Sequence, residues 1–438
     1  MIQRAYAYRF YPTPPQETML RRQIGASRKI WNWGLAVRST AWKDRQERVT
    51  SYDLMLMLTQ LKKQHEWAWL TEVSAVPLQQ TLRDLDAAFA NFFAGRARYP
   101  RYKPVATARK CVRYTRSGFT YRNGQLKLAK IMTEPLNIVW SRPLPKGTIP
   151  SSVTVSCDKA GRWHISILVE TEVRSEETTG AIVGIDLGVK TFAVLSDSET
   201  ITLPDRISVK EARVRRYQKR FARTQKASAN RKKAQVKLSR AHAHVADTRR
   251  DFLHKTTTEL VRTYDIIVLE DLNIAGLTRR PKPRLSANGK KYVPNGARAK
   301  AGLNRALLRA GFAEFRSLLE YKAAWYGKRV IVIDRYHPSS KLCSVCGWKN
   351  SELRLSDRTW SCRECGTLLD RDLNAAKNIL AAGLVVLEKE REILFGGACG
   401  TEVRPQDPVP LDSLTHESVL VAAPVVKQET FILEPVPT

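Results

Sequence analysis

The sequence predicts a multidomain protein of mixed α and β structure, in which an N-terminal β region with an inserted helical bundle precedes an α/β domain with a small cysteine-rich insertion. Three observations predict this fold. Before residue 170, apolar and polar residues alternate at 2–10, apolar residues recur at helical spacing at 16–93, and short β-prone runs follow at 112–170. After residue 181, buried strands alternate with helical segments. Two C-x-x-C pairs interrupt that second alternation.

The N-terminal region is expected to contain strands on either side of a helical segment. Residues 2–10 alternate and are rich in aromatic and β-branched side chains, which predicts a strand. Residues 16–93 have helical apolar spacing and predict a bundle of about four helices. A basic stretch with tyrosines and prolines, 94–110, precedes six short β-prone runs within 112–170. The polar, acidic segment 171–180 then predicts a linker.

The C-terminal region begins with AIVGIDLGVKTFAVLSD, which predicts two adjacent strands joined by a glycine turn at Gly188. The very basic segment 209–264 predicts a helical hairpin. IIVLED and RVIVID predict buried strands, with a basic loop at 275–300 and one amphipathic helix at 302–326 between them. A last helix is expected at about 372–390.

The charge of the chain indicates a polyanionic partner. The 438 residues include 74 Lys and Arg against 42 Asp and Glu, which gives a formal net charge of +32 and a pI of about 10.1. A compact protein tolerates that self-repulsion better when DNA or RNA neutralises it. Composition alone leaves open a ribosomal-type protein or a merely very soluble basic one.

The cysteines indicate metal binding in a reducing compartment. Cys343 and Cys346 lie in CSVCG, Cys362 and Cys365 lie in CRECG, and 15 residues separate the pairs. This spacing is typical of a structural zinc site closed by four thiolates, and a glycine after each pair suits a knuckle turn. The alternative is a set of unpaired core cysteines. The N-terminus lacks the apolar core of a secretion signal, and no uninterrupted apolar stretch is long enough for a bilayer, so an intracellular protein is predicted.

Three carboxylates end or open elements of the predicted α/β domain. Asp186 lies in the strand VGIDLGVK, Glu270 ends IIVLE, and Asp372 opens the helix DLNAAKN. Singly, they could be a turn acid, a solvated strand terminus and a helix N-cap. Together they could supply the several oxygen ligands that hard cations need. Two Mg²⁺ ions about 3.5–4 Å apart can drive phosphodiester hydrolysis, which suits so basic a chain.

The segments VGIDLGVKTFAV, IIVLEDLNIAGL and DRDLNAAKNIL resemble the three RuvC motifs of the TnpB (OrfB) family. That family consists of RNA-guided nucleases encoded by insertion sequences, related to compact type V CRISPR effectors. AYAYRFYPTPPQETMLRR, WNWGL, LEYKAAWYGKRV and YHPSSKLCSVCG resemble it as well, so the likeness runs from residue 2 to about 404. It implies Asp186, Glu270 and Asp372 as the catalytic triad. Asp271 competes for the second place and Asp370 for the third, where the family's D-x-N-A-A pattern favours Asp372.

The resemblance also implies the domain plan: a β wedge with an inserted helical bundle, then a split RuvC (RNase H-like) α/β domain with an inserted zinc ribbon. The implied regions are a wedge strand at 1–14, a helical recognition region at 15–110, a wedge β-barrel at 111–180, the first RuvC segment at 181–337, the zinc ribbon at 338–369, the second RuvC segment at 370–395 and a disordered tail at 396–438.

Contacts with nucleic acid are expected at three places. Tyr52 and Gln79 match family positions that face DNA, and the basic segment 209–256 would meet guide RNA or an RNA–DNA heteroduplex. The stretch GRARYPRYKP could pair with phosphate and stack on bases. Its four candidate cations are Arg96, Arg98, Arg101 and Lys103. The alternatives are surface helix residues, a solvated charged surface and a hinge loop.

These features predict an RNA-guided DNA endonuclease. It would bind a guide RNA from its own element, recognise a short target-adjacent motif and hydrolyse both strands of double-stranded DNA at one RuvC site. Two catalytic Mg²⁺ ions, one structural Zn²⁺ ion, a monomer and a bacterial cytoplasmic, nucleoid-associated location are expected, with no membrane partner. The alternatives are a transposase that performs strand transfer, an RNA-guided repressor that binds without cleavage and a zinc-ribbon transcription factor.

Overall fold

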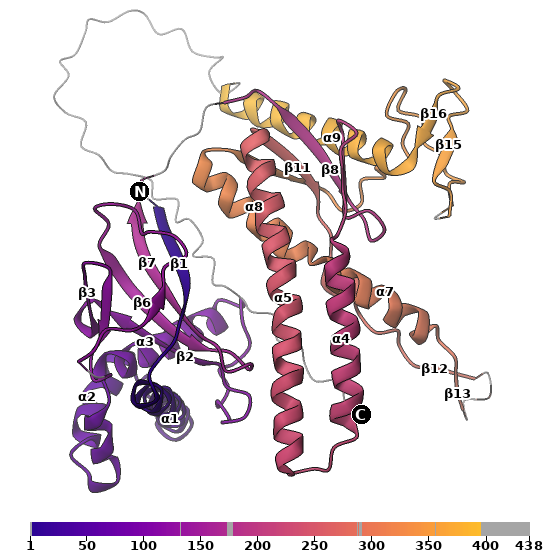
Figure 1. Ribbon diagram of the computed structural model, residues 1–438. Coiled ribbons are helices and arrows are strands. Elements are labelled where there is room, and N and C mark those ends of the chain that lie inside the picture. Colours follow the sequence, from indigo (N-terminus) through magenta and orange to yellow (C-terminus); the bar gives the residue numbers. More distant parts are fainter. Residues whose placement is uncertain are drawn as a thin grey trace, which may run out of the picture. The chain divides into compact units, whose positions relative to one another are not determined.

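The computed structural model describes residues 2–131, 133–172, 178–286, 288, 291–354 and 356–395 (Figure 1). The tail expected at 396–438 and the centre of the predicted linker lie outside these residues. The chain divides into two compact units, Met1–Val173 with Ser208–Asp247, and Arg174–Ile207 with Thr248–Thr438. Among the described helices, none combines the length and the apolarity needed to cross a bilayer.

The first unit contains a five-stranded antiparallel sheet in the order β2-β6-β7-β1-β5. Alternate residues of β7 (Trp163–Thr171) are buried, because successive side chains of a strand point to opposite faces. Where we expected a barrel, the pairing of the described residues leaves β2 and β5 at the two ends of the order. The other strands are β1 (Ile2–Phe10), β2 (Lys110–Thr115), β5 (Ile138–Val139) and β6 (Pro150–Cys157), with a separate hairpin of β3 (Phe119–Arg122) and β4 (Gln125–Leu128).

The helical region lies in the chain between β1 and β2. It comprises α1 (Pro14–Arg45), α2 (Ser51–Leu61), a 3₁₀ helix η1 (His65–Glu72) and α3 (Ala75–Phe93). Thr13 and Thr50 begin α1 and α2 with capping boxes, each side chain accepting a backbone N–H while the residue three positions on returns the bond. The sequence predicted about four helices here. The third helical element is a 3₁₀ helix of eight residues, a type of helix that often connects α-helices.

The expected basic hairpin is formed by α4 (Asp205–Ala222) and α5 (Ala229–Thr263). Near its turn, the Arg231 guanidinium lies 4.1 Å from the centroid of the Phe221 ring. At the other end, Arg206 forms an ion pair with Asp251 at 3.3 Å. These contacts join two antiparallel helices, as Figure 1 shows. The prediction of a helical hairpin is confirmed.

The second unit is built on a sheet in the order β10-β9-β8-β11-β14. Strands β8, β11 and β14 are parallel, and β9 returns antiparallel to β8 through the expected turn, where Gly188 N–H donates to the Phe192 carbonyl at 3.2 Å. Parallel strands with helical crossovers are typical of α/β domains. The bounds are β8 (Ile182–Leu187), β9 (Ala193–Leu195), β10 (Thr200–Ile201), β11 (Ile266–Glu270) and β14 (Arg329–Ile333).

Helices cover both faces of this sheet. Ile185 and Leu269 point into a core shared with α5, α7 (Ala297–Ala310) and α8 (Phe312–Tyr326). Val268, one residue before Leu269, points to the opposite face, where it packs with Ile379 of α9 (Arg371–Phe395). The two-residue period of the strands therefore assigns alternate side chains to the two helical layers.

Two expectations for this unit are wrong. The single helix expected at 302–326 is two helices, because Gly311, with a φ of 74°, adopts a left-handed conformation that ends α7 and begins α8. The expected loop at 275–300 contains a short helix, a hairpin and the start of α7. Those elements are α6 (Ile274–Leu277), β12 (Arg284–Leu285) and β13 (Tyr292–Val293).

The cysteine-rich insertion lies between β14 and α9. Its strands β15 (Thr359–Ser361) and β16 (Leu368–Asp370) pair antiparallel, and α9 follows β16 directly. The broader prediction, a multidomain protein of mixed α and β structure, is confirmed.

Candidate active site and metal centre

Asp186 and Glu270 are neighbours across two parallel strands. Ile185 of β8 pairs with Leu269 of β11, so the next residues along the two strands are Asp186 and Glu270. Since Ile185 and Leu269 face the core under α5 and α8, both carboxylates face the α9 side. Both residues are half-buried. Side chains in such adjacent positions on one face of a sheet lie within interaction distance.

Asp372 reaches the same face from the first turn of α9. It shares a helical stripe with Ala376 and Ile379, and Ile379 is buried against the sheet. The helix can come this close because a glycine stands on each side of the contact, Gly184 in the sheet and Gly383 in α9. A Cβ added at Gly184 would lie 2.6 Å from the Leu380 backbone nitrogen, and one at Gly383 would lie 2.5 Å from Val268. Three separate elements therefore carry carboxylates on the α9 side of the sheet, near enough for Glu270 and Asp372 to act on the charge of Asp186.

Gly184 and Gly383 were not among the residues predicted from the sequence. A glycine inside a buried strand often marks a place where another backbone approaches closely, so the G-x-D of VGIDLG carried a usable signal for Gly184. Nothing comparable marked Gly383, because its partner Val268 is distant in the sequence.

The electrostatics show that Asp186 feels the negative charges of both other carboxylates. Burial, together with the negative charges of Asp372 and Glu270, raises the pKa of Asp186 to about 7, against a lowering effect of Arg371. Burial also raises the pKa of Glu270, with a contribution from Asp271. A cation bound beside Asp186 and Glu270 would favour the ionised form of both carboxyl groups.

The two competing acids have other roles. The Asp370 carboxylate accepts the backbone N–H groups of Asp372 at 3.0 Å and Leu373 at 2.9 Å, so Asp370 rather than Asp372 caps α9. The Asp271 carboxylate forms ion pairs with Arg316, at 2.7 Å, and with Arg335. Hydrogen bonds from these two arginines lower the pKa of Asp271. Two arginines thus engage Asp271 and the start of α9 engages Asp370, whereas Asp372 has one longer ion pair, with Arg358 at 3.6 Å.

These environments predict opposite results for adjacent acids. Glu270→Gln should reduce divalent-cation binding about tenfold or more, because it removes an anionic oxygen ligand. Asp271→Asn should leave that affinity within about twofold while lowering thermal stability, because two arginines lose their partner. Isothermal titration with Mn²⁺ and a thermal melt of both variants check this pair. Equal loss of Mn²⁺ affinity in the two variants would contradict it.

The four paired cysteines converge as well. Their Sγ atoms all lie within 4.8 Å of one another, with Cys343 and Cys365 3.7 Å apart and Cys346 and Cys362 3.5 Å apart. In the described part of the chain, this is the one group of three or more potential ligating residues that is so compact. The expected knuckle turns are present, because Gly347 N–H donates to the Cys343 carbonyl and Gly366 N–H to the Cys362 carbonyl.

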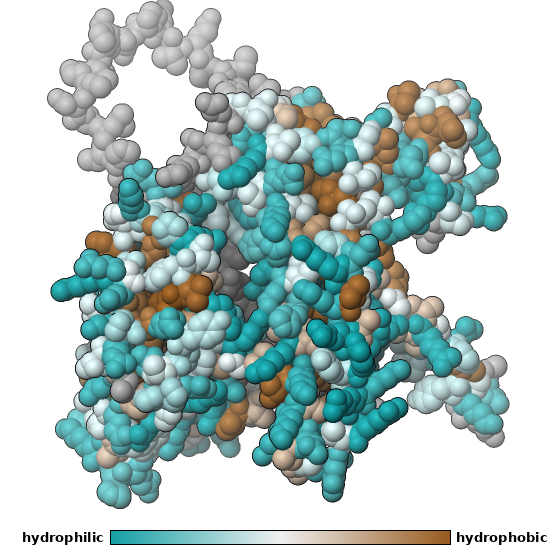
Figure 2. Space-filling model, viewed as in Figure 1, coloured by the Kyte–Doolittle hydropathy of each residue, from teal (hydrophilic) through white to brown (hydrophobic). Residues whose placement is uncertain are grey.

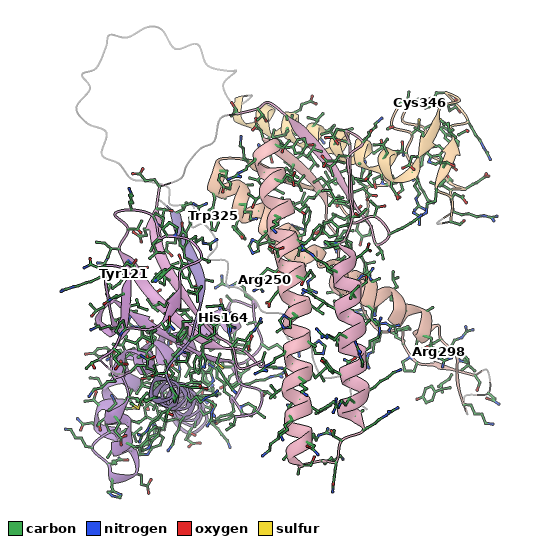
Figure 3. All side chains as sticks on the ribbon, viewed as in Figure 1. Tyr121, His164, Arg250, Arg298, Trp325 and Cys346 are labelled. Atoms are coloured by element: carbon green, nitrogen blue, oxygen red, sulfur yellow. The ribbon has the colours of Figure 1, made fainter. Side chains whose placement is uncertain are left out.

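The cysteine group fits a metal ion chemically. The hydroxyl of Thr367, 3.2 Å from Cys365 Sγ, and the Thr367 backbone lower the pKa of Cys365 to about 6, which favours the ligating thiolate. A backbone hydrogen bond from Trp348 lowers the pKa of Cys346, but burial and its thiol neighbours outweigh it and raise that pKa. A bound cation would stabilise the thiolate form of all four cysteines. Figure 3 labels Cys346 beside β15 and β16.

The predicted nucleic-acid residues lie at the surface of the first unit, with one exception. Tyr52 is 68% exposed, and Gln79, Arg96, Arg98 and Arg101 are also exposed. The exception is Lys103. Its Nζ lies 3.3 Å from the centroid of the Trp31 ring, and burial lowers its pKa to about 8.

Two further surfaces were not predicted residue by residue from the sequence. One face of α4 carries four cations around a shallow depression, which Arg215, Arg216, Lys219 and Arg220 line together with Arg223, just after the helix. Figure 2 shows hydrophilic side chains over α4 and α5. In the first unit, Phe92 packs edge-on against Tyr99, with centroids 5.3 Å apart, next to Phe93, which is 79% exposed. Exposed aromatic rings beside cations suit stacking with bases.

Three family models match segments of the chain. The model described as "Probable transposase" (OrfB of IS605) matches residues 164–280. A "Cas12f1-like, TNB domain" matches residues 312–379, and a "Helix-turn-helix domain" matches residues 1–47. A solved structure titled "Cryo-EM structure of the Cas12f1-sgRNA-target DNA complex" is similar with a TM-score of 0.46 and 12% identity, covering 86% of this chain and 98% of that one.

Curated relatives match almost the whole chain. A protein of Streptomyces pristinaespiralis named "Putative RNA-guided DNA endonuclease" is 47% identical over 405 residues, which is 92% of this chain and 93% of that protein. The "Putative RNA-guided DNA endonuclease InsQ" of Escherichia coli K12 is 32% identical over 411 residues, covering 92% and 96%. The three motif segments, the converging carboxylates and these matches agree, and the chain belongs to the OrfB (TnpB) family.

Proposed function

We propose that the protein is an RNA-guided DNA endonuclease that binds a guide RNA from its own element, recognises a short target-adjacent motif and hydrolyses both DNA strands at one site. The convergence of Asp186, Glu270 and Asp372 on the α9 side of the sheet carries this proposal. The names of the full-length relatives support it. The second unit without its cysteine insertion, together with Ser208–Asp247, would then be the split RuvC domain, and Met1–Val173 would be the wedge with its helical recognition region.

In this proposal the three carboxylates hold two magnesium ions. When bound, such ions activate a water molecule and stabilise the leaving oxygen of the phosphodiester. The strands fix Asp186 and Glu270 side by side, and α9 sets Asp372 opposite them. Asp186 must be ionised to act as a ligand. Because its pKa is about 7, a bound cation has to favour the loss of its proton.

The four cysteines are proposed to hold one zinc ion. Four thiolates close the tetrahedral shell and leave no open position, so this zinc is structural. The small core of the insertion supports that role, since Trp360 and Leu369 are buried around Cys343 and Cys362 and little else encloses them.

Basic surfaces are proposed to hold the nucleic acids. The cationic face of α4 and the rest of the α4–α5 hairpin suit the backbone of guide RNA or of its heteroduplex with DNA. Tyr52, Gln79 and the exposed arginines of 94–110 suit the duplex beside the target. A monomer in the bacterial cytoplasm, associated with the nucleoid, completes this proposal.

The decisive experiment uses the protein purified with the RNA that it retains. Sequencing that RNA gives the guide segment, and a plasmid library with a matching target and randomised flanks reports the adjacent motif. We expect double-strand cuts that require magnesium, a matching target and the motif. Cleavage that ignores the guide sequence, or a preparation without bound RNA, would overturn the proposal.

A second candidate is a transposase, which the description of the family model at residues 164–280 favours. A RuvC-like site can join strands as well as cut them, so the carboxylates do not distinguish the two. Joined products formed from transposon ends without guide RNA would support this candidate. Target binding without any cleavage in magnesium would instead support an RNA-guided repressor.

A further inference from the structure

We propose that Asn374 and Asn378 are positioning residues that tie the cysteine insertion to α9, so that the metal bound by the cysteines helps to hold Asp372 in the catalytic group. The inference rests on the proposed assignment of Asp372 as a ligand. It adds a mechanical connection between the two metal centres.

The two carboxamides bracket the first cysteine. Asn374 Nδ2 donates to the Leu342 carbonyl at 2.6 Å, and Asn374 Oδ1 accepts the Ser344 backbone N–H at 2.8 Å. Asn378 Nδ2 donates to the Leu342 carbonyl and to the Ser339 carbonyl, both at 2.7 Å. Leu342 and Ser344 are the residues on either side of Cys343.

Both asparagines are buried, with 1% of Asn374 and 7% of Asn378 exposed. Water therefore cannot easily replace the lost partner when a carboxamide is removed, and a buried carbonyl left unpaired is costly. These four hydrogen bonds are accordingly a strong constraint on the insertion and on the helix together.

The asparagines lie on the face of α9 opposite its contact with the sheet. At 100° per residue, positions 374 and 378 lie roughly 160–240° from the stripe of Asp372 and Ala376. The helix is held on one side by its close approach to Gly184 of β8 and to Val268 of β11, and on the other by the carboxamides. Release of the second side allows α9 to rotate or shift, which moves Asp372 relative to Asp186 and Glu270.

The cysteines keep the segment 339–344 in the shape that the carboxamides require. The Cys343 N–H donates to the Trp348 carbonyl at 2.8 Å within the first knuckle, and its Sγ belongs to the four-thiol group. Metal in that group orders the knuckle, and the knuckle orders the first two turns of α9. A structural metal would therefore affect the affinity of the catalytic cation without touching it.

The test compares Asn374→Asp and Asn378→Asp with Lys377→Ala, an exposed change between them on the same helix. Aspartate has the same size as asparagine, so no cavity forms. Asn374→Asp keeps the acceptor for Ser344 N–H, whereas Asn378→Asp places an acceptor against two carbonyls. We expect Mn²⁺ affinity, measured by titration and by the Mn²⁺ electron paramagnetic resonance signal, to fall about threefold and at least tenfold, respectively.

Two further readouts separate the possible causes of failure. Zinc content should stay at one per chain in every variant, and amide hydrogen exchange should rise in the first two turns of α9 in both asparagine variants but not in Lys377→Ala. If Asn378→Asp has the hydrogen exchange and the Mn²⁺ affinity of the parent protein, the proposed connection between the insertion and α9 is wrong. If parent and Asp186→Asn bind Mn²⁺ equally, the catalytic assignment fails instead, while hydrogen exchange still reports on the tie.

Discussion

Asp186→Asn is expected to slow DNA cleavage at least about 1000-fold and, in the same protein, to stabilise the fold when no catalytic cation is bound. The loss of activity follows from removing a charged ligand of the proposed cations, and corresponds to about 4 kcal/mol in the barrier. The gain in stability follows from the burial and repulsion that raise the pKa of Asp186 to about 7.

The sign of the pH dependence follows from that raised pKa. Well below pH 3.8, Asp186 is protonated in both the folded and the unfolded chain, and it contributes nothing. Between its ordinary pKa of 3.8 and about 7, the unfolded chain ionises while the folded chain keeps the proton, so folding becomes less favourable as the pH rises. Above pH 7 the penalty is constant, at most about 4 kcal/mol. Asparagine cannot ionise and removes it.

The measurement is urea unfolding of parent and variant between pH 4 and pH 8.5, without magnesium but with zinc, so that the cysteine site stays filled. The stability difference should widen from pH 4 to pH 7 and then stay level. Asp370→Asn is the matched control, since asparagine caps a helix as well as aspartate and Asp370 does not belong to the group. A difference that does not vary with pH would sink the electrostatic interpretation, and undiminished cleavage would sink the catalytic one.

Gly184→Ala is expected to have the second largest effect, although it adds only one methyl group and replaces none of the proposed ligands. Its Cβ would lie 2.6 Å from the Leu380 nitrogen and closer still to the Ala376 carbonyl oxygen. Both obstacles are backbone atoms of α9, so no side-chain rotation relieves them. The helix must move by about 1 Å, a displacement that can cost about 100-fold in rate when it misplaces a catalytic group.

The same substitution should lower the free energy of unfolding by about 1–3 kcal/mol, the usual range for overpacking a close contact. Gly302→Ala provides the control, because a Cβ there has no atom within 4 Å and the position lies inside α7. Alanine should stabilise that helix slightly. Denaturant unfolding and single-turnover cleavage test both variants, and a Gly184→Ala protein as active as Gly302→Ala would contradict the close approach.

The sequence alone was sufficient for features that depend on local spacing. The two C-x-x-C pairs and their following glycines predicted a four-thiol group, because each knuckle turn is formed by a few consecutive residues. The strands β8 and β11 and the basic hairpin were predicted for the same reason. The local patterns failed where a single residue altered the backbone, as at Gly311, which divides one apolar helical pattern into two helices.

Only the tertiary structure showed which partners engage the competing acids. Motif spacing alone cannot separate the adjacent acids Glu270 and Asp271. In the structure, Asp271 meets two arginines, one from α8 and one from the chain after β14, and its carboxylate is thereby occupied. Likewise, Asp370 turns back to cap α9, whereas Asp372 lies on the sheet-facing stripe of that helix.

The sequence by itself determined the kinds of side chain at the site and the elements that carry them, since periodicity and short motifs are properties of neighbouring residues. The tertiary structure decided how close α9 comes to β8, which acids meet, and that Lys103 packs on Trp31 instead of pointing outward. These outcomes depend on contacts between segments that are distant in the chain, and the burial and charge of each group exist only once those contacts have formed.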